Sequence, residues 1–123
     1  VKRVIGLPGD TIRYENDQLY VNGKKTNESY LNNYLTKFKD DKLQKTYSYN
    51  SFFQSLADKA QAFTQDANGN TSFTIEVPKG EYLLLGDDRL VSKDSRQVGT
   101  FKASQLQGEA KFRFWPLNRI GTF

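Results

Sequence analysis

The sequence predicts a mainly β fold that carries one helical insertion. Three observations support this: short stretches of alternating apolar and polar residues, turn dipeptides between them, and a middle segment whose apolar residues recur at helical spacing. At 123 residues the chain is long enough to form one domain with its own core. We expect the core within residues 1–27 and 64–123, and the insertion at about residues 28–63.

The front of the chain predicts three short strands, at residues 2–6, 11–14 and 18–21. The first two are separated by Leu7-Pro8-Gly9-Asp10, in which proline presets φ and glycine supplies a permissive position, so a turn is expected there. Asn22-Gly23 is typical of a tight hairpin turn, and we expect the chain to fold back after it.

The middle of the chain changes to helical spacing. A first helical segment is expected where apolar residues recur at Tyr30, Leu31, Tyr34, Leu35 and Phe38. Ser51, with Gln54 three residues later, resembles a capping box and predicts the start of a second helix. The apolar stripe of that helix is expected to pack in the core and consists of Phe52, Phe53, Leu56, Ala57, Ala60 and Phe63.

The second half returns to strands, which are expected at residues 73–77, 81–85, 99–101 and 110–114. Asn68-Gly69 predicts a further hairpin before the first of them. The run at 81–85 is largely apolar, as a central strand is, and it leads into a highly charged loop at 86–96.

Composition limits the chemistry. The chain has no cysteine and no histidine, which excludes disulfide and thiol chemistry and removes the commonest general base and metal ligand. A base that acts at neutral pH must then be a carboxylate, a tyrosine or a lysine. The net charge of +4 suits contact with anionic lipid or wall polymer, or simply solubility. Because basic and acidic residues are interspersed, no nucleic-acid partner is expected.

The printed sequence contains no run that approaches the about 20 apolar residues of a membrane span. It also begins with valine inside a predicted strand and contains no methionine. We therefore expect an N-terminal part that precedes Val1.

Two places in the chain could carry chemistry, and each has an ordinary alternative. Lys2 is either a solvated strand lysine or a general base, and the second role requires a neutral amine, which burial among apolar groups favours. The loop at 86–96 is either a set of surface ion pairs or a buried network that supports a catalytic group. Asp87, Asp88 and Asp94 could bind Ca²⁺, but their spacing does not match an EF-hand loop and no metal is expected.

Residues 2–10, KRVIGLPGD, resemble the lysine box of the type I signal peptidases, which are membrane-bound serine proteases with a Ser-Lys dyad. The loop at 86–96, GDDRLVSKDSR, resembles the last box of that family, usually written G-D-N-R-D-N-S-x-D-S-R. It departs from that box at Asp88, Leu90 and Val91. The tail at 111–121 is similar to that of streptococcal and related Gram-positive members.

The resemblance implies a signal-peptidase/LexA-like β scaffold of short antiparallel strands and a role for each matched residue. Lys2 would be the general base, and Ser92 would orient it through a hydrogen bond. Asp94 and Arg96 would form a supporting ion pair, and Val1 would contact the substrate. The family's nucleophilic serine lies upstream of its lysine, so we expect that serine before Val1. The mechanism implies no cofactor.

The function implied is that of a membrane-associated serine endopeptidase, which removes N-terminal signal peptides from secreted preproteins at Ala-X-Ala-type sites. The expected location is the cell membrane, with one N-terminal anchor and the catalytic domain on the extracellular face. The expected partners are preprotein signal peptides and the lipid surface. Without its first strands the β scaffold would expose a strand edge, so a strand-exchange oligomer is also possible.

Two alternatives stay open. The first is a signal-peptidase-like factor that has lost catalysis and serves an assembly process such as pilus formation. Retention of Lys2 counts against it, and the residue at the nucleophile position would decide. The second is a self-cleaving Ser-Lys repressor-type peptidase of the cytosol, which shares the dyad and a related β fold. The insertion and the string at 2–10 disfavour it.

Overall fold

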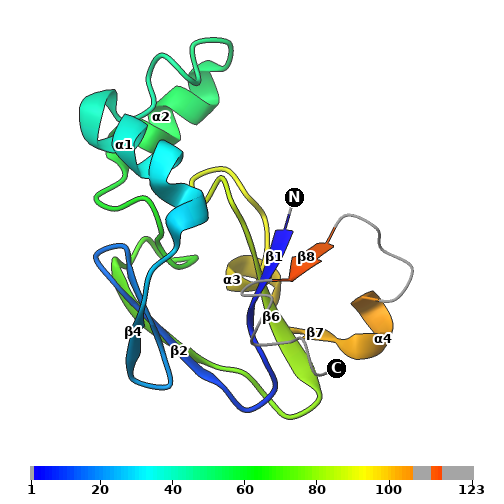
Figure 1. The fold of residues 1–123 in the computed structure, drawn as a ribbon. Coiled ribbons are helices and arrows are strands. Elements are labelled where there is room, and N and C mark those ends of the chain that lie inside the picture. The colour runs from blue at the N-terminus through cyan, green and yellow to red at the C-terminus, as the bar shows by residue number, and fades with distance from the viewer. Residues whose placement is uncertain (1, 107–111, 115–123) are drawn as a thin grey trace.

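Two four-stranded sheets and a group of helices make up the part of the chain that the computed structural model describes, residues 2–106 and 112–114 (Figure 1). The prediction of a mainly β fold with helices in the middle of the sequence is confirmed. Among these residues, no helix is both long and apolar enough to cross a bilayer.

The first sheet contains the start of the chain in an interior position. Its strand order is β7-β6-β1-β8, with β1 at Lys2–Gly6, β6 at Glu81–Gly86, β7 at Phe101–Lys102 and β8 at Phe112–Phe114. β1 pairs antiparallel with β6 and parallel with β8, so this sheet is mixed rather than wholly antiparallel. Residues of β1 are therefore held from both sides.

The second sheet has the order β4-β3-β2-β5 and is antiparallel. Its strands are β2 at Thr11–Glu15, β3 at Gln18–Val21, β4 at Lys24–Thr26 and β5 at Ser72–Glu76. Asn22 and Gly23 form the expected hairpin turn, with φ of 52° and 81°.

The hairpin predicted at Asn68-Gly69 is wrong. The two residues lie in a turn, closed by a hydrogen bond from the Gly69 N–H to the Asp66 carbonyl, but β5 pairs with β2 instead of with a strand just before the turn. The preceding segment is engaged differently, because the N–H groups of Phe63 and Thr64 donate to the Asp17 carboxylate.

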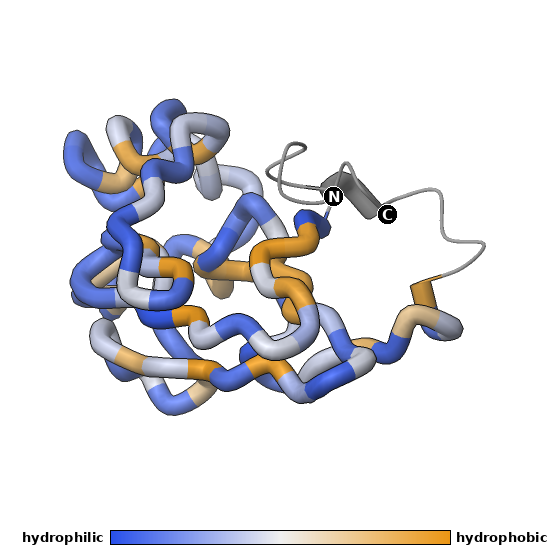
Figure 2. Tube along the Cα trace, turned by 60° about the horizontal axis from the view of Figure 1, so that its bottom comes forward, coloured by the Kyte–Doolittle hydropathy of each residue, from blue (hydrophilic) through white to orange (hydrophobic). Residues whose placement is uncertain are grey.

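The main core receives apolar side chains from both sheets. Its buried members are Ile5, Ile12, Tyr14, Leu19, Val21, Val77, Leu83 and Leu85. Figure 2 shows the change from hydrophilic to hydrophobic residues just after the start of the chain, along β1. Alternation across the pleat directs one face of β1 and β6 into this core and leaves Lys2 and Gly86 on the other face.

The helices in the middle of the sequence form a helical lobe, residues 29–63, at one side of the sheets (Figure 1), whereas the short helix α4 at Ala103–Leu106 lies outside it. It comprises the 3-10 turn η1 at Ser29–Leu31, α1 at Asn32–Asp41 and α2 at Ser51–Lys59. The lobe has its own buried cluster, made of Leu31, Leu43, Tyr47, Ala57 and Phe63.

Two details of α2 differ from prediction. Asn50, not Ser51, caps the helix, since its side chain accepts a hydrogen bond from the Phe53 N–H at 3.0 Å. Phe52 and Leu56 are 66% and 36% exposed, so their assignment to the core is wrong. A short helix on the edge of a lobe buries a single i, i+4 row, here Phe53 and Ala57, and leaves the adjacent row in solvent.

The identity of the cap can be tested by substitution. Asn50→Ala is expected to lower the free energy of unfolding by about 1 kcal/mol, because it removes the acceptor for an otherwise unbonded N–H at the start of α2. Ser51→Ala, at the first helical residue, should change it by less than about 0.5 kcal/mol. Urea unfolding of the full-length protein checks both, and equal effects would contradict the assignment.

Candidate active site around Lys2 and the loop after β6

Lys2 lies directly across the sheet from a residue without a side chain. Its Cα pairs with Gly86 of β6 on one side and with Phe112 of β8 on the other, and Lys2 is half-buried. A Cβ built on Gly86 would lie 2.0 Å from Ser92 Oγ and 2.6 Å from Ser92 Cβ. Ser92 therefore occupies the space that a side chain at position 86 would take.

This arrangement brings Lys2 and Ser92 to the same face of the first sheet. Side chains directly opposite each other in an antiparallel pair have Cβ atoms about 4.5–5.5 Å apart. The Ser92 hydroxyl stands at the place of the missing Gly86 Cβ, so it lies within reach of the lysine side chain. The geometry also explains the glycine, because any larger residue at position 86 would displace Ser92.

Asp94 and Arg96 form a buried, bidentate ion pair. Arg96 Nη2 donates to Asp94 Oδ2 at 2.8 Å and Arg96 Nε to Asp94 Oδ1 at 2.9 Å, and both side chains are almost completely buried. The same carboxylate accepts the Gly86 N–H at 2.9 Å. The ion pair is thus attached to the residue that faces Lys2.

Burial alone would raise the pKa of Asp94, but its hydrogen bonds with Arg96, the positive charge of that guanidinium and the backbone N–H of Gly86 together lower it below the ordinary value of 3.8. Asp94 is therefore a carboxylate at neutral pH. It also begins the short helix α3 at Ser95–Val98 with a capping box, in which the Gln97 side chain accepts the Asp94 N–H.

Arg89 is an important residue that the sequence did not single out. Its side chain is fully buried, and Nε donates to the Gly86 carbonyl at 2.7 Å. Nη2 donates to Glu28 Oε2 at 2.7 Å, and Nη1 donates to the Tyr14 hydroxyl and to Thr64 Oγ1, each at 3.1 Å. Arg89 thereby joins the loop after β6 to β2 and to the segments on either side of the helical lobe.

A second unpredicted contact fixes β1 to the same loop. Arg3 donates from Nε and Nη2 to the two carboxylate oxygens of Asp87, at 2.7 and 3.1 Å, and its guanidinium lies 4.0 Å from the centre of the Tyr30 ring. The separation of 84 positions between Arg3 and Asp87 explains why no local pattern indicated the pair. Because adjacent residues in a strand point to opposite faces of the sheet, the charge of Arg3 lies on the face opposite to that of Lys2.

The three loop carboxylates have three different partners. Asp87 binds Arg3, Asp88 accepts a hydrogen bond from the Tyr47 hydroxyl, and Asp94 binds Arg96. Within residues 2–106 and 112–114, no group of three or more metal-ligating side chains is placed to hold an ion. Val1, expected to contact substrate, and the tail at 115–121 lie outside the described residues.

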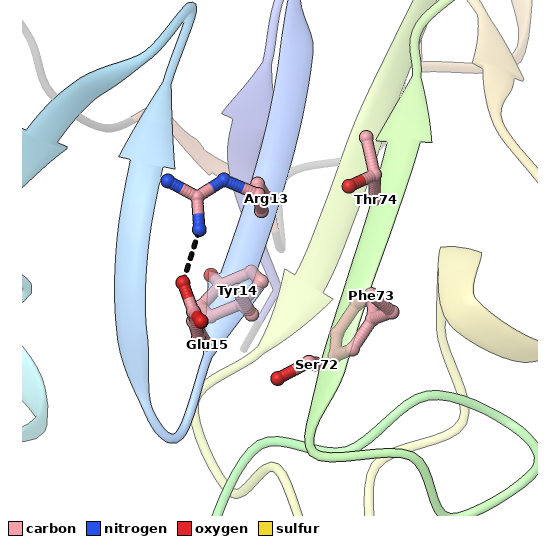
Figure 3. Close-up of a pocket in the computed structure, with 6 residues that line it drawn as sticks. All are labelled: Arg13, Tyr14, Glu15, Ser72, Phe73 and Thr74. Carbon is pink, nitrogen blue, oxygen red and sulfur yellow. Dashed lines mark hydrogen bonds and ion pairs between the residues drawn. The ribbon is translucent and has the colours of Figure 1, made fainter.

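A shallow pocket lies on the second sheet, and its lining contains none of the candidate site residues (Figure 3). It is lined from β2 and β5 by Arg13, Tyr14, Glu15, Ser72, Phe73 and Thr74. Arg13 and Glu15 form an ion pair with each other there. With its two charges paired, this pocket presents no group poised for proton transfer.

The pKa of Asp94 predicts a pH-dependent stability. Asp94→Asn is expected to lower the free energy of unfolding by about 3–5 kcal/mol at pH 7, because Arg96 loses its buried counter-charge. The pKa of Asp94 is lower in the folded protein than the ordinary value of 3.8. The ionised carboxylate therefore stabilises the wild type fully above pH 3.8, and this stabilisation is lost as the pH falls through the folded-state pKa.

The difference in the free energy of unfolding between the wild type and Asp94→Asn should therefore become smaller below about pH 4. Urea unfolding at pH 7 and pH 3 measures it, with Asp40→Asn on the exposed side of α1 as a control. A difference that stayed constant between the two pH values would argue against the ionised pair.

Comparison with known proteins places the chain in a family. The family described as signal peptidase, peptidase S26, matches residues 1–115. Signal peptidase I of Streptococcus pneumoniae (strain ATCC BAA-255 / R6) is 68% identical over 130 residues, which cover 100% of this chain and 64% of the relative. Signal peptidase IB of Staphylococcus aureus (strain Mu50 / ATCC 700699) is 43% identical over 120 residues, covering 98% and 55%.

Among solved structures, the crystal structure of a signal peptidase I from Enterococcus faecalis V583 is similar. It has a TM-score of 0.55 and 33% sequence identity, over 84% of this chain and 74% of that one. The chain spans 64% or less of the length of these two curated relatives. The match along residues 1–115 and the identity across the whole chain show that the chain belongs to the signal peptidase family, peptidase S26.

Proposed function

We propose that the protein containing this chain is a membrane-associated serine endopeptidase that removes N-terminal signal peptides from secreted preproteins. Membership of the S26 family and 68% identity to a signal peptidase I support the reaction class. The observation that carries the proposal for this chain is the placement of Ser92 over Gly86, directly across from Lys2.

In the proposed reaction, Lys2 is the general base. The nucleophilic serine belongs to the part of the protein upstream of this chain, and its hydroxyl attacks the carbonyl after a small residue of an Ala-X-Ala-type site. The neutral amine of Lys2 accepts the hydroxyl proton and then gives it to the leaving amine. The same amine then takes a proton from a water molecule, which attacks the acyl-enzyme, and gives that proton to the serine oxygen as the bond to the acyl group breaks.

The neighbours of Lys2 fit that role. The Ser92 hydroxyl can accept a hydrogen bond from the amine and fix its direction. Asp94 holds the Gly86 N–H and the start of α3, and Arg96 neutralises Asp94, so the segment carrying Ser92 is held at both ends. The proposed mechanism uses no cofactor.

The proposed location is the cell membrane, with an anchor upstream of this chain and the catalytic part on the extracellular face. The net charge of +4 is compatible with an anionic lipid surface beside the substrate's cleavage site. The strand-exchange oligomer stays a prediction. β1 is paired on both sides, and the edges of the first sheet, among the described strands, are β7 and β8.

Lys2→Ala in the full-length protein is expected to lower signal-peptide cleavage by about 10²- to 10⁴-fold, the usual contribution of a general base. Ser92→Ala should cost about 10-fold, because the amine loses an orienting partner. Lys25→Ala, at an exposed lysine of β4, is the matched control and should leave cleavage unchanged. The rate of conversion of a preprotein in detergent or vesicles measures all three.

Full cleavage by Lys2→Ala would overturn the assignment of the base. A folded full-length wild type that cleaves no signal peptide, and whose nucleophile position holds a residue other than serine, would favour the non-catalytic assembly factor instead.

A further inference from the structure

The helical lobe contacts the loop after β6 just before Ser92. Figure 1 shows this loop, in yellow, reaching the helical lobe. The Tyr47 hydroxyl donates a hydrogen bond to Asp88 Oδ1, and the side chains of Leu90 and Val91 pack against the lobe's buried cluster. Tyr47 is itself a member of that cluster and only 1% exposed, so its hydroxyl is presented from a fixed position.

Asp88 is connected to Ser92 through the backbone. The carbonyl of Asp88 accepts a hydrogen bond from the N–H of Ser92 at 2.9 Å and another from the N–H of Val91 at 3.2 Å. These bonds close a turn that runs from Asp88 to Ser92. The side chain of Asp88 faces Tyr47 while its carbonyl holds the Ser92 backbone. A displacement of Asp88 would therefore also displace the backbone of Ser92.

Asp88, Leu90 and Val91 all contact the helical lobe. Burial raises the pKa of the Tyr47 hydroxyl, with the Asp88 hydrogen bond and charge adding to it, so Tyr47 remains a donor at neutral pH. Burial raises the pKa of Asp88 above its ordinary value of 3.8, and hydrogen bonds from the Tyr47 hydroxyl and the Leu90 N–H offset only part of that rise.

We propose that Tyr47 is a positioning residue for signal-peptide cleavage, which acts by holding Asp88 and, through the Asp88 carbonyl, the Ser92 backbone. The inference rests on the proposed function, and it gives the helical lobe a role in the reaction besides its own folding. It follows that the lobe affects the turnover step, where the orientation of Lys2 matters, more than substrate binding.

The test uses steady-state cleavage of a preprotein by the full-length protein. Tyr47→Phe keeps the buried ring and removes the hydroxyl, and is expected to lower kcat by about 3- to 10-fold with KM unchanged. Tyr49→Phe is the matched control, since Tyr49 lies in the same lobe but is 75% exposed, and it should leave kcat unchanged. Equal kcat values for the two variants would overturn the proposal.

A double-mutant cycle separates positioning from a general loss of stability. If Tyr47 acts through Ser92, then Tyr47→Phe should have little further effect on kcat in a Ser92→Ala background. The full 3- to 10-fold loss in that background would contradict the proposal. If Tyr47→Phe does not fold, two variants of Asp88 test the same contact. Asp88→Asn keeps an acceptor for the Tyr47 hydroxyl and should retain kcat within about 2-fold. Asp88→Ala removes the acceptor and should lower kcat by more than that.

These outcomes are distinct from those that test the proposed function. Cleavage by the wild type that does not depend on Lys2 would refute the dyad itself. Cleavage that depends on Lys2 but is indifferent to Tyr47 and to Asp88→Ala would refute only the positioning role.

Discussion

The buried guanidinium of Arg89 is the interaction on which the arrangement of the loop depends. Through Glu28, Tyr14 and Thr64 it contacts both segments that flank the helical lobe and the second sheet, and through the Gly86 carbonyl it contacts the first sheet. A buried cation is costly to desolvate, so it is stable only with all of these partners in place. The parts of the fold that supply them are therefore fixed relative to one another around the loop.

Within that frame, the site combines two kinds of constraint. Hydrogen bonds and ion pairs from Asp87, Asp94 and Arg96 tie the loop to β1 and β6. A steric constraint comes from Gly86, whose missing side chain leaves the space that Ser92 fills. The polar contacts fix the path of the loop backbone, and the absence of a side chain at Gly86 leaves room for Ser92 on the face of the sheet that carries Lys2.

Local patterns were sufficient for most of the strands and for the existence of the helices. Alternation, an apolar run and turn residues located β1, β3 and β6, because each of these signals depends on neighbouring residues in the sequence. The partner of β5 and the ion pair of Arg89 with Glu28 could not be predicted, since they join residues about 60 positions apart. The candidate site was indicated by the resemblance of two strings, and not by the charge pattern, which fitted exposed ion pairs equally well. The exposed Phe52 shows that an apolar periodicity does not by itself say how much of a helix face is covered.

The interior place of β1 has a consequence for the order in which the molecule forms. Lys2 is made before almost every other residue of this chain, yet its strand neighbours are Gly86 and Phe112. Contacts between such distant positions require the closure of large loops and are among the slower events of folding. During synthesis, this lysine therefore stays without its strand neighbours until nearly the whole chain has emerged, so the arrangement around it can only form late.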